Sequence, residues 1–218
     1  MAALIFLVCV SSWGQTPLNQ LSYSSDITAI FSSTLLQDEE AGEDDLAGSV
    51  GVVSLGLPLP TDLIALHRIA PTGGLFSTDT GLTLSGTIFI PGDVIQFDGA
   101  NYSYRFNDQA VGLPAGANVD AVTVDGSDLL LSFDTTLLLS GNLVADEDLV
   151  RFNGASFSIE FDGSAAGVLE AQDLDGAHRL ANDNLLLSFN GGGGGDGMVF
   201  GDEDVLEFVP GPATWTLA

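Results

Sequence analysis

The sequence predicts an all-β protein made of about four tandem repeats, most simply a small four-bladed β-propeller. Matched segments recur every 55 or 56 residues, as Ser77, Ser132 and Ser188 show. Each copy holds about four runs rich in Val, Ile, Leu, Phe and Tyr, bounded by Gly, Asp, Asn and Pro. No stretch combines helical periodicity with helix caps. A four-stranded unit near 50 residues is typical of a propeller blade, and an open or curved β-repeat stack is the alternative.

The repeats divide the chain into four copies after a short N-terminal segment. We expect one β-repeat domain over 15–218, with approximate copies at 20–58, 59–113, 114–168 and 169–218. The first copy lacks its opening segment and the last ends on its final strand. Strands from both termini could therefore close a ring.

The repeat pattern carries a resemblance. Its recurring pieces are L-L-L-S-F-D/N, D-E-D-L/V-V/L-x-F and F-S/D-I-x-F-D-G-S, and they cover most of the chain beyond the N-terminal segment. This pattern resembles propeller-like β-repeats of exported bacterial proteins of unknown function. The resemblance implies secretion and an all-β repeat fold, and it implies no activity.

The N-terminus begins with a short apolar run, Ala2–Val10. A membrane span needs about 20 apolar residues, so the run is too short to cross a bilayer. Its length fits the apolar region of a signal peptide, with Ser12 and Gly14 as the small residues before a cleavage site, although no basic region precedes it. We therefore predict a signal peptide over 1–14 and an exported protein, periplasmic or extracellular. A buried first strand is the alternative.

The charge of the chain limits its partners. Asp and Glu total 30 against four Arg and no Lys, which gives a formal net charge of −26. Hydrophobic residues make up 45% of the chain, enough to form a core, so the sequence is not a disordered acidic tail. The missing Lys and the negative charge argue against nucleic acid and against anionic lipid. The expected partner is an unknown protein or carbohydrate, with no membrane insertion after signal removal.

A fixed carboxylate spacing recurs in every copy. Two Asp, Glu or Asn side chains stand 14 residues apart, and the pairs are Asp26 and Glu40, Asp79 and Asp93, Asp134 and Asp148, and Asn190 and Asp204. A turn dipeptide such as Ser85-Gly86 or Ser140-Gly141 lies midway, which predicts a β-hairpin. Folding there would place the two members of each pair almost opposite one another, at what we call the hairpin neck.

The hairpin necks are candidate Ca²⁺ sites. Like charges directly opposite one another are destabilising, whereas clustered carboxylate oxygens are the ligands that Ca²⁺ prefers. The site should be best formed at Asp134, Asp146 and Asp148. The full set of predicted metal ligands is Asp79, Asp93, Asp134, Asp146, Asp148, Asn190, Asp202 and Asp204. The alternative is that these side chains bond local backbone N–H groups at strand ends.

Histidines and aspartates also recur in the opening strand of the repeats. His67 and His178 share one repeat position, with Thr123 in the middle copy. A shared position favours an architectural role, so we predict partly buried histidines packed near the blade edge. Asp120 and Asp175 recur in the strand that would line a propeller channel. They could alternatively converge on a metal or a polar ligand.

No motif of catalysis appears. The chain has no G-x-S-x-G elbow, no H-E-x-x-H helix and no candidate cysteine nucleophile. We therefore predict no catalytic or cofactor-binding residue and a binding or scaffold role. A propeller-type hydrolase or lyase with a channel site is the alternative.

Two further expectations concern packing. Arg151 follows the acids Asp146–Asp148 closely in sequence, so we expect it to pair with them. Tyr102, Phe157 and Trp215 fall in equivalent final strands. They are most simply explained by packing within the blades, with a carbohydrate platform as the alternative.

Overall fold

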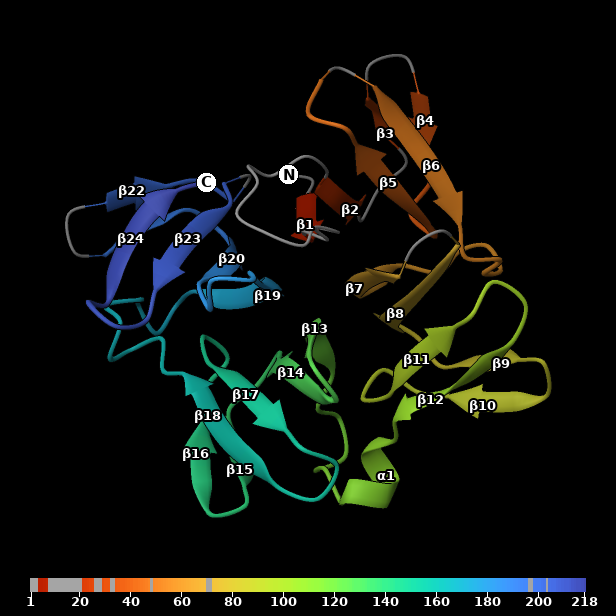
Figure 1. The fold of residues 1–218 in the computed structure, drawn as a ribbon. Helices are drawn as coiled ribbons and strands as arrows, with labels where there is room; N and C mark the ends of the chain where they lie inside the picture. The colour runs from red at the N-terminus through yellow and green to blue at the C-terminus, as the bar shows by residue number, and fades with distance from the viewer. Residues whose placement is uncertain are drawn as a thin grey trace.

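The protein is a four-bladed β-propeller, which confirms the predicted fold class (Figure 1). The computed structural model describes residues 4–7, 21–25, 29–31, 34–47, 49–69, 72–195, 198–202 and 204–218. Four antiparallel sheets of four strands each surround a common centre. Each sheet comes from one continuous segment of chain, and its first strand is the innermost.

The blades follow one another in chain order. From the centre outwards, the strands of blade 1 are β1 (Leu4–Leu7), β2 (Leu21–Ser25), β5 (Glu40–Asp44) and β6 (Val50–Ser54). Those of blade 2 are β7 (Leu63–Ile69), β8 (Gly73–Thr78), β11 (Val94–Phe97) and β12 (Tyr102–Phe106). The strands of blade 3 are β13 (Val119–Asp125), β14 (Asp128–Phe133), β17 (Leu149–Phe152) and β18 (Phe157–Phe161). Those of blade 4 are β19 (Asp173–Arg179), β20 (Leu185–Asn190), β23 (Leu206–Val209) and β24 (Thr214–Leu217).

The opening strand of blade 1 lies within the N-terminal apolar run. β1 pairs with β2 and contacts β19 of blade 4, so it brings the first and last blades together. This strand is the missing opening segment of the first copy. The predicted signal peptide overlaps it, and the predicted cleavage position and Cys9 lie outside the described residues. The signal peptide therefore stays a prediction.

A two-stranded hairpin projects between the second and third strands of every blade. The hairpins pair β3 (Ala29–Phe31) with β4 (Thr34–Leu36), β9 (Leu82–Leu84) with β10 (Thr87–Phe89), β15 (Leu137–Leu139) with β16 (Asn142–Val144), and β21 (Gly193–Gly195) with β22 (Met198–Phe200). Both residues of the turns Ser85-Gly86 and Ser140-Gly141 have positive φ, as a two-residue type I′ turn requires. The hairpins predicted at these turns are confirmed.

The core lies between neighbouring blades. Successive side chains of a strand point to opposite faces, so a strand sandwiched between two blades needs a continuous apolar run. Leu129 and Leu131 of β14 pack in the cluster shared with blade 2, whereas Leu130 packs in the cluster shared with blade 4. This placement explains the L-L-L-S-F repeat.

Helical structure is a minor part of the fold. A single turn, α1 (Asp108–Val111), connects blades 2 and 3. Within the ranges that the structure describes, no helix is long and apolar enough to cross a membrane.

Candidate functional site

The polar residues closest to the propeller axis lie on the innermost strands. β7, β13 and β19 each carry an extra residue opposite the second strand of their blade, at Ile64, Asp120 and Asp175. Such a β-bulge leaves one residue unpaired and re-aims its side chain, and bulges are frequent beside functional sites. The recurring aspartates of the sequence are therefore bulge residues.

Two histidines from opposite blades meet at the centre. The rings of His67 on β7 and His178 on β19 stack with centroids 6.0 Å apart and an interplanar angle of 18°. Thr123 on β13 places its Oγ1 3.1 Å from His67 Nδ1, so three blades contribute one residue each. Both histidines are buried. They lie at the inner edge of their blades and are more deeply buried than the sequence predicts.

Burial keeps these imidazoles neutral. It lowers the pKa of His67 to about 3, with the neighbouring His178 and Arg68 as further causes. Burial likewise lowers the pKa of His178 to about 4. Nδ1 of His178 has no hydrogen-bond partner within the described part of the chain. A buried imidazole pair of this kind packs the centre and is poorly suited to carrying a proton at neutral pH.

A group of carboxyl groups lies on the innermost strands of blades 3 and 4. Asp120 is only 7% exposed and Asp175 only 6%, and Asp173 is half-buried. Ser188 Oγ donates a hydrogen bond to Asp175 Oδ1 over 2.8 Å. Burial is the largest cause that raises the pKa of Asp175 to about 7 and that of Asp173 to about 6, and it raises the pKa of Asp120 well above its ordinary value. The charge of Asp173 acts on Asp120 most strongly, and that of Asp175 acts on it more weakly. Convergence of Asp120 and Asp175 on a metal or a polar ligand stays a prediction.

In blades 2, 3 and 4 the first member of the hairpin-neck pair is exposed and lies beside the start of an inner strand. Asp134 Oδ1 and Oδ2 accept hydrogen bonds from the backbone N–H and the side-chain amide of Asn118, over 2.9 and 2.6 Å. Asp79 Oδ1 accepts from the N–H of Asp62 over 3.1 Å. Asn190 ends β20 opposite Asp173. Asp26, the corresponding residue of the first copy, lies outside the described residues.

The second member binds the backbone of the neck itself. In blades 2, 3 and 4 one carboxylate oxygen accepts from the N–H three residues earlier, and these bonds join Asp93 to Ile90, Asp148 to Ala145 and Asp204 to Gly201 over 2.8 to 2.9 Å. The other oxygen of Asp148 accepts from Gly163 N–H over 2.8 Å, and that of Asp93 from Asp108 N–H over 3.0 Å. This is the local backbone bonding that we weighed against Ca²⁺.

The remaining predicted ligands have less defined roles. The backbone carbonyl of Asp146 accepts from Leu174 N–H over 3.0 Å, and the charge of Asp202 acts on Asp175. Across the ranges that the structure describes, no three His, Cys, Asp or Glu side chains are grouped as a metal site. Calcium at the hairpin necks stays a prediction.

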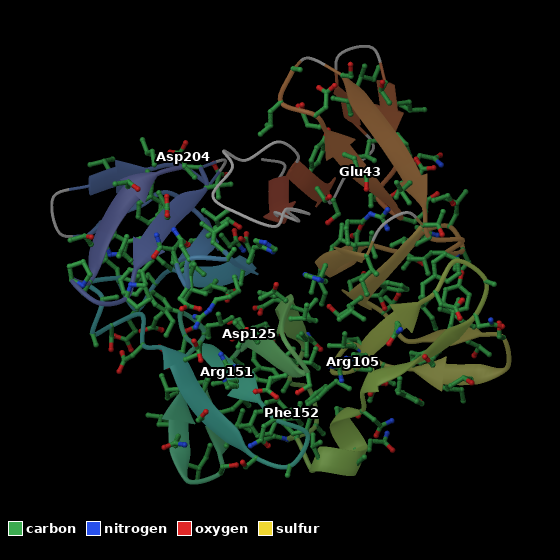
Figure 2. The ribbon with its side chains drawn as sticks, viewed as in Figure 1. Glu43, Arg105, Asp125, Arg151, Phe152 and Asp204 are labelled. Carbon is green, nitrogen blue, oxygen red and sulfur yellow. The ribbon has the colours of Figure 1, made fainter. Side chains whose placement is uncertain are left out.

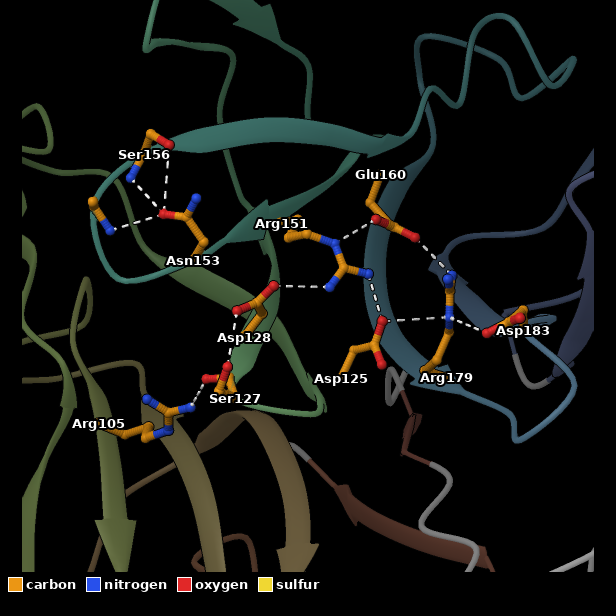
Figure 3. Close-up of polar contacts among 11 residues, drawn as sticks. Arg105, Asp125, Ser127, Asp128, Arg151, Asn153, Ser156, Glu160, Arg179 and Asp183 are labelled. Carbon is orange, nitrogen blue, oxygen red and sulfur yellow. Dashed lines mark hydrogen bonds and ion pairs between the residues drawn. The ribbon is translucent and has the colours of Figure 1, made fainter.

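Arg151 does not pair with the acids Asp146–Asp148. It bonds Asp128 over 3.0 Å and Glu160 over 2.9 Å, and it also pairs with Asp125 (Figure 3). The reason is the direction of β17, which carries Arg151 away from the hairpin neck and towards the β13–β14 turn. Carboxylates around the guanidinium, Glu160 first, raise the pKa of Arg151 above its usual range. The expected pairing was therefore wrong.

The other arginines join consecutive blades, a pattern that the sequence analysis missed. Arg68 of blade 2 pairs with Glu43 of blade 1 over 2.9 Å, Arg105 of blade 2 donates to the carbonyl of Ser127 in blade 3 over 2.6 Å, and Arg179 of blade 4 pairs with Glu160 of blade 3 over 2.7 Å. Figure 2 places Glu43 in blade 1, Arg105 in blade 2, and Arg151 with Asp125 in blade 3. One signal was available, since Arg68 and Arg179 each follow a repeat-equivalent histidine.

The hairpins expose aliphatic side chains, which the sequence analysis also missed. These residues are Ile30, Leu35, Ile88, Leu138, Leu143 and Val199. Leu138 and Leu143, 69% and 70% exposed, lie opposite each other in the β15–β16 register, and Ile30 and Leu35 do so in β3–β4. The hairpins of blades 2 and 3 lie at the outer rim of the molecule (Figure 1). The available signal was the apolar residue at the middle of each short hairpin strand, such as Leu138 in L-L-L, because alternate side chains of a strand point to opposite faces.

The aromatic residues of the final strands serve packing. Tyr102 stacks on Phe97 with ring centroids 4.8 Å apart and donates its hydroxyl to the carbonyl of Leu55. Phe157 is buried, and Trp215 packs on Phe208 with centroids 4.8 Å apart. The contacts agree with packing within and between blades, and a carbohydrate platform stays an alternative.

Comparisons with known proteins give no family. No protein-family description and no curated protein matches the chain. Solved structures with a similar chain path include the extracellular domain of the putative one component system BT4673 from B. thetaiotaomicron, with a TM-score of 0.42, 9% identity, and 99% of this chain covered against 33% of that one. A second is a catalytically inactive virginiamycin B lyase from Staphylococcus aureus, with a TM-score of 0.38, 9% identity, and 97% of this chain covered against 57% of that one. A third is the extracellular domain of the putative hybrid two component system BT3049 from B. thetaiotaomicron, with a TM-score of 0.36, 12% identity, and 99% of this chain covered against 23% of that one. The chain thus spans less than two thirds of each of these proteins.

Proposed function

We propose that this propeller is an exported, non-catalytic binding or scaffold protein that engages another protein through its hairpins. The observation that carries the proposal is the set of exposed aliphatic side chains on the hairpins, among them the cross-strand pair Leu138 and Leu143. Apolar residues that gather on an otherwise charged surface often mark an interaction site. Their presence on the hairpin of every blade suits a partner that makes several equivalent contacts.

The charge of the molecule indicates the chemistry around those contacts. The four arginines bond to acceptors within the propeller, while 30 Asp and Glu residues give the chain its strong negative charge. A partner should therefore surround its apolar contacts with Lys or Arg, because complementary charge speeds association and excludes wrong partners.

A paired-variant capture experiment tests the proposal. The intact protein carries a photo-crosslinker near β15–β16 and is exposed to the exported proteins of its source cells. We expect one partner to be enriched, and enrichment to fall by at least about tenfold for Leu138→Ser with Leu143→Ser, since hydrophobic anchors dominate interface energies. The control is Leu59→Ser with Leu169→Ser, which removes two exposed leucines outside the hairpins. Equal capture by both double variants would contradict the proposal.

The positions of the central polar residues favour binding over the hydrolase or lyase alternative. His67, Thr123 and His178 share one repeat position, and Asp120 and Asp175 share another. A catalytic group would be expected to stand apart from the repeat, with a nucleophile or an acid placed against a base. Loss of a measured hydrolytic or lyase activity in Asp175→Asn would support the alternative instead.

Calcium at the hairpin necks belongs to the proposal as a stabilising ion. It is supported by the recurrence of the paired acids in the sequence, with Asp134, Asp146 and Asp148 as the best-formed set. Calorimetric titration of the full chain with Ca²⁺ tests it. Binding heat that disappears in Asp134→Asn with Asp146→Asn would support it, and the absence of heat in the unaltered protein would refute it.

A further inference from the structure

Asp120 is a buried carboxyl group that receives no hydrogen bond from an N–H or hydroxyl group of the described residues. The residue is 7% exposed, and its one side-chain neighbour of hydrogen-bonding type in the described part of the chain is the carboxyl group of Asp173. A buried charge is costly unless it is paired or bonded, so a carboxyl group in this setting needs a proton or a cation. Asp93 and Asp148, two other buried aspartates, differ from it, because both oxygens of each accept backbone N–H groups.

The strongest neighbour of Asp120 is another acceptor. Asp173, on the adjacent blade, acts on it more than any other charged group, and the two side chains are close enough to form a hydrogen bond when one of them is protonated. Asp134 and Asp175 add further negative charge. Oδ1 of Asp173 is itself buried without a hydrogen-bond partner in the part of the chain that the structure describes. Two carboxylates that face each other repel unless a positive species lies between them.

The protein's own cations are used elsewhere. Arg151 and Arg179 bind Asp125, Asp128, Asp183 and Glu160, at the end of blade 3 away from the hairpin neck. Arg68 bonds Glu43, and Arg105 donates to a backbone carbonyl in the β13–β14 turn. None of these contacts reaches Asp120 or Asp173.

We propose that the carboxylates of Asp120 and Asp173 bind one hard divalent cation between blades 3 and 4. The β-bulge aims Asp120 out of the regular strand, and β19 of the next blade supplies Asp173. The site is separate from the hairpin necks, and it does not rest on the hairpin-binding function. The cation would join the two blades at the side of the ring where the negative charges of Asp134 and Asp175 accumulate.

The ligand set suits an alkaline-earth ion. Mg²⁺ usually keeps several waters and uses only one or two carboxylates, and Ca²⁺ accepts carboxylates, carbonyls and waters. Neither ion therefore requires three carboxylates or imidazoles at one point, a grouping that is absent among the described residues. Carboxylate ligands alone are a poor match for thiophilic transition metals.

Calorimetry on the full chain tests the site. Protein freed of metal with a chelator is titrated with Ca²⁺ or Mg²⁺ at about pH 8, where acids of ordinary pKa are ionised. We expect one equivalent of at least one ion to bind at this site, in addition to any Ca²⁺ bound at the hairpin necks. At a hundredfold excess over the dissociation constant, the melting temperature should rise by roughly 5–10 °C over the value at equal ionic strength in NaCl. The ion that binds identifies the natural class.

Variants distinguish a specific cation site from a general effect of cations on the negative charge of the protein. Asp120→Asn and, independently, Asp173→Asn should remove this one equivalent from the binding heat, together with the rise in melting temperature that it causes. Asp98→Asn removes the same charge from an exposed turn and should retain both. Asp79→Asn, at a hairpin neck, should also retain both.

Three results of the titrations would overturn the proposal, and so would evidence that the two carboxyl groups share a proton. The first is no binding of either ion by the unaltered protein. The second is equal loss in Asp98→Asn, which would mean charge screening alone. The third is loss in Asp79→Asn with retention in Asp120→Asn, which would place the ion at a hairpin neck. If the carboxyl groups instead share a proton, Asp120→Asn should be more stable than the unaltered protein at about pH 8 whether or not the ions are present.

Discussion

At the scale of single residues, the acids of this protein differ in function although they look alike in sequence. Asp148 accepts hydrogen bonds from two backbone N–H groups, Asp134 holds the start of an inner strand, and Asp120 has no N–H or hydroxyl donor in the part of the chain that the structure describes. Spacing in the sequence predicts that these residues recur, but it does not predict what lies beside them. That depends on which blade packs against each strand.

Asp148 should be the most important acid of the hairpin neck for stability. Replacing it with Ala removes both acceptors from buried N–H groups of Ala145 and Gly163. Hydrogen bonds to a charged acceptor are worth more than neutral ones, so we expect Asp148→Ala to lower the free energy of unfolding by roughly 2–4 kcal/mol. Urea denaturation measures this. Asp162→Ala, an exposed acid near the same segment, is the control, and an equally large loss there would argue against the explanation.

The buried histidines should make the protein less stable in mild acid. The pKa of His178 is lowered from 6.5 to about 4, so the unfolded chain binds a proton that the folded chain does not between those values. Stability from this group is complete above about pH 6.5 and is lost as the pH falls towards 4. Between pH 6.5 and 5 the loss should reach about 2 kcal/mol.

The control for this effect is the variant His178→Gln. Asp173 and Asp175 have raised pKa values, so their contribution runs the other way and is lost as the pH rises through about 6 and 7. Only a comparison of the two proteins isolates the histidine. Urea denaturation at several pH values should show a smaller acid loss in His178→Gln, and parallel curves would contradict the prediction.

At the scale of elements, the hairpin turns were predictable and the inter-blade contacts were not. The residue types of Ser85-Gly86 and Ser140-Gly141 are enough to predict two-residue turns. The repeated serine of the second strand shows the limit. Ser24 and Ser77 donate to the first carbonyl of the next blade's inner strand, whereas Ser132 donates within its own blade and Ser188 bonds Asp175. One repeat position thus serves three kinds of contact.

The stability of the hairpin turns should depend on their glycines because of backbone conformation and not because of crowding by neighbouring atoms. Gly141 has φ of 87°, and a Cβ added there would meet no atom within 4 Å. Gly141→Ala should therefore lower the free energy of unfolding by about 1–2 kcal/mol, the penalty of a left-handed residue with a side chain. Gly51→Ala is the matched control, because its added Cβ meets only Glu43 O at 3.8 Å and its φ is ordinary. Thermal denaturation should find that variant unchanged or stabilised, and equal losses would refute the explanation.

At the scale of the whole molecule, the repeat period and the composition of the sequence predict the ring of blades. The apolar runs of the inner strands need this arrangement, because each packs against the two adjacent blades. Leu129, Leu130 and Leu131 illustrate this, since adjacent residues belong to different inter-blade clusters. The centre could not be predicted in the same way. The stacking of His67 on His178 joins residues more than a hundred positions apart, and only ring closure brings them together. The candidate cation site at Asp120 and Asp173 arises from the same closure.

The net charge of −26 should make the folded protein more stable in salt. Repulsion among carboxylates opposes the compact state, and the screening length falls from about 10 Å at 0.1 M to about 3 Å at 1 M salt. Salt also weakens the bridges of Arg68 and Arg179, but those groups are partly buried and few against the many acids. The melting temperature should therefore rise from low salt to 1 M NaCl, and KCl should have the same effect if screening is the cause.

The variant Arg179→Gln should lower the melting temperature most at low salt, where the attraction of Arg179 to Glu160 and Asp125 is least screened. A melting temperature that falls with NaCl would show that the arginine bridges between blades, and not the repulsion among acids, dominate the electrostatics of the ring.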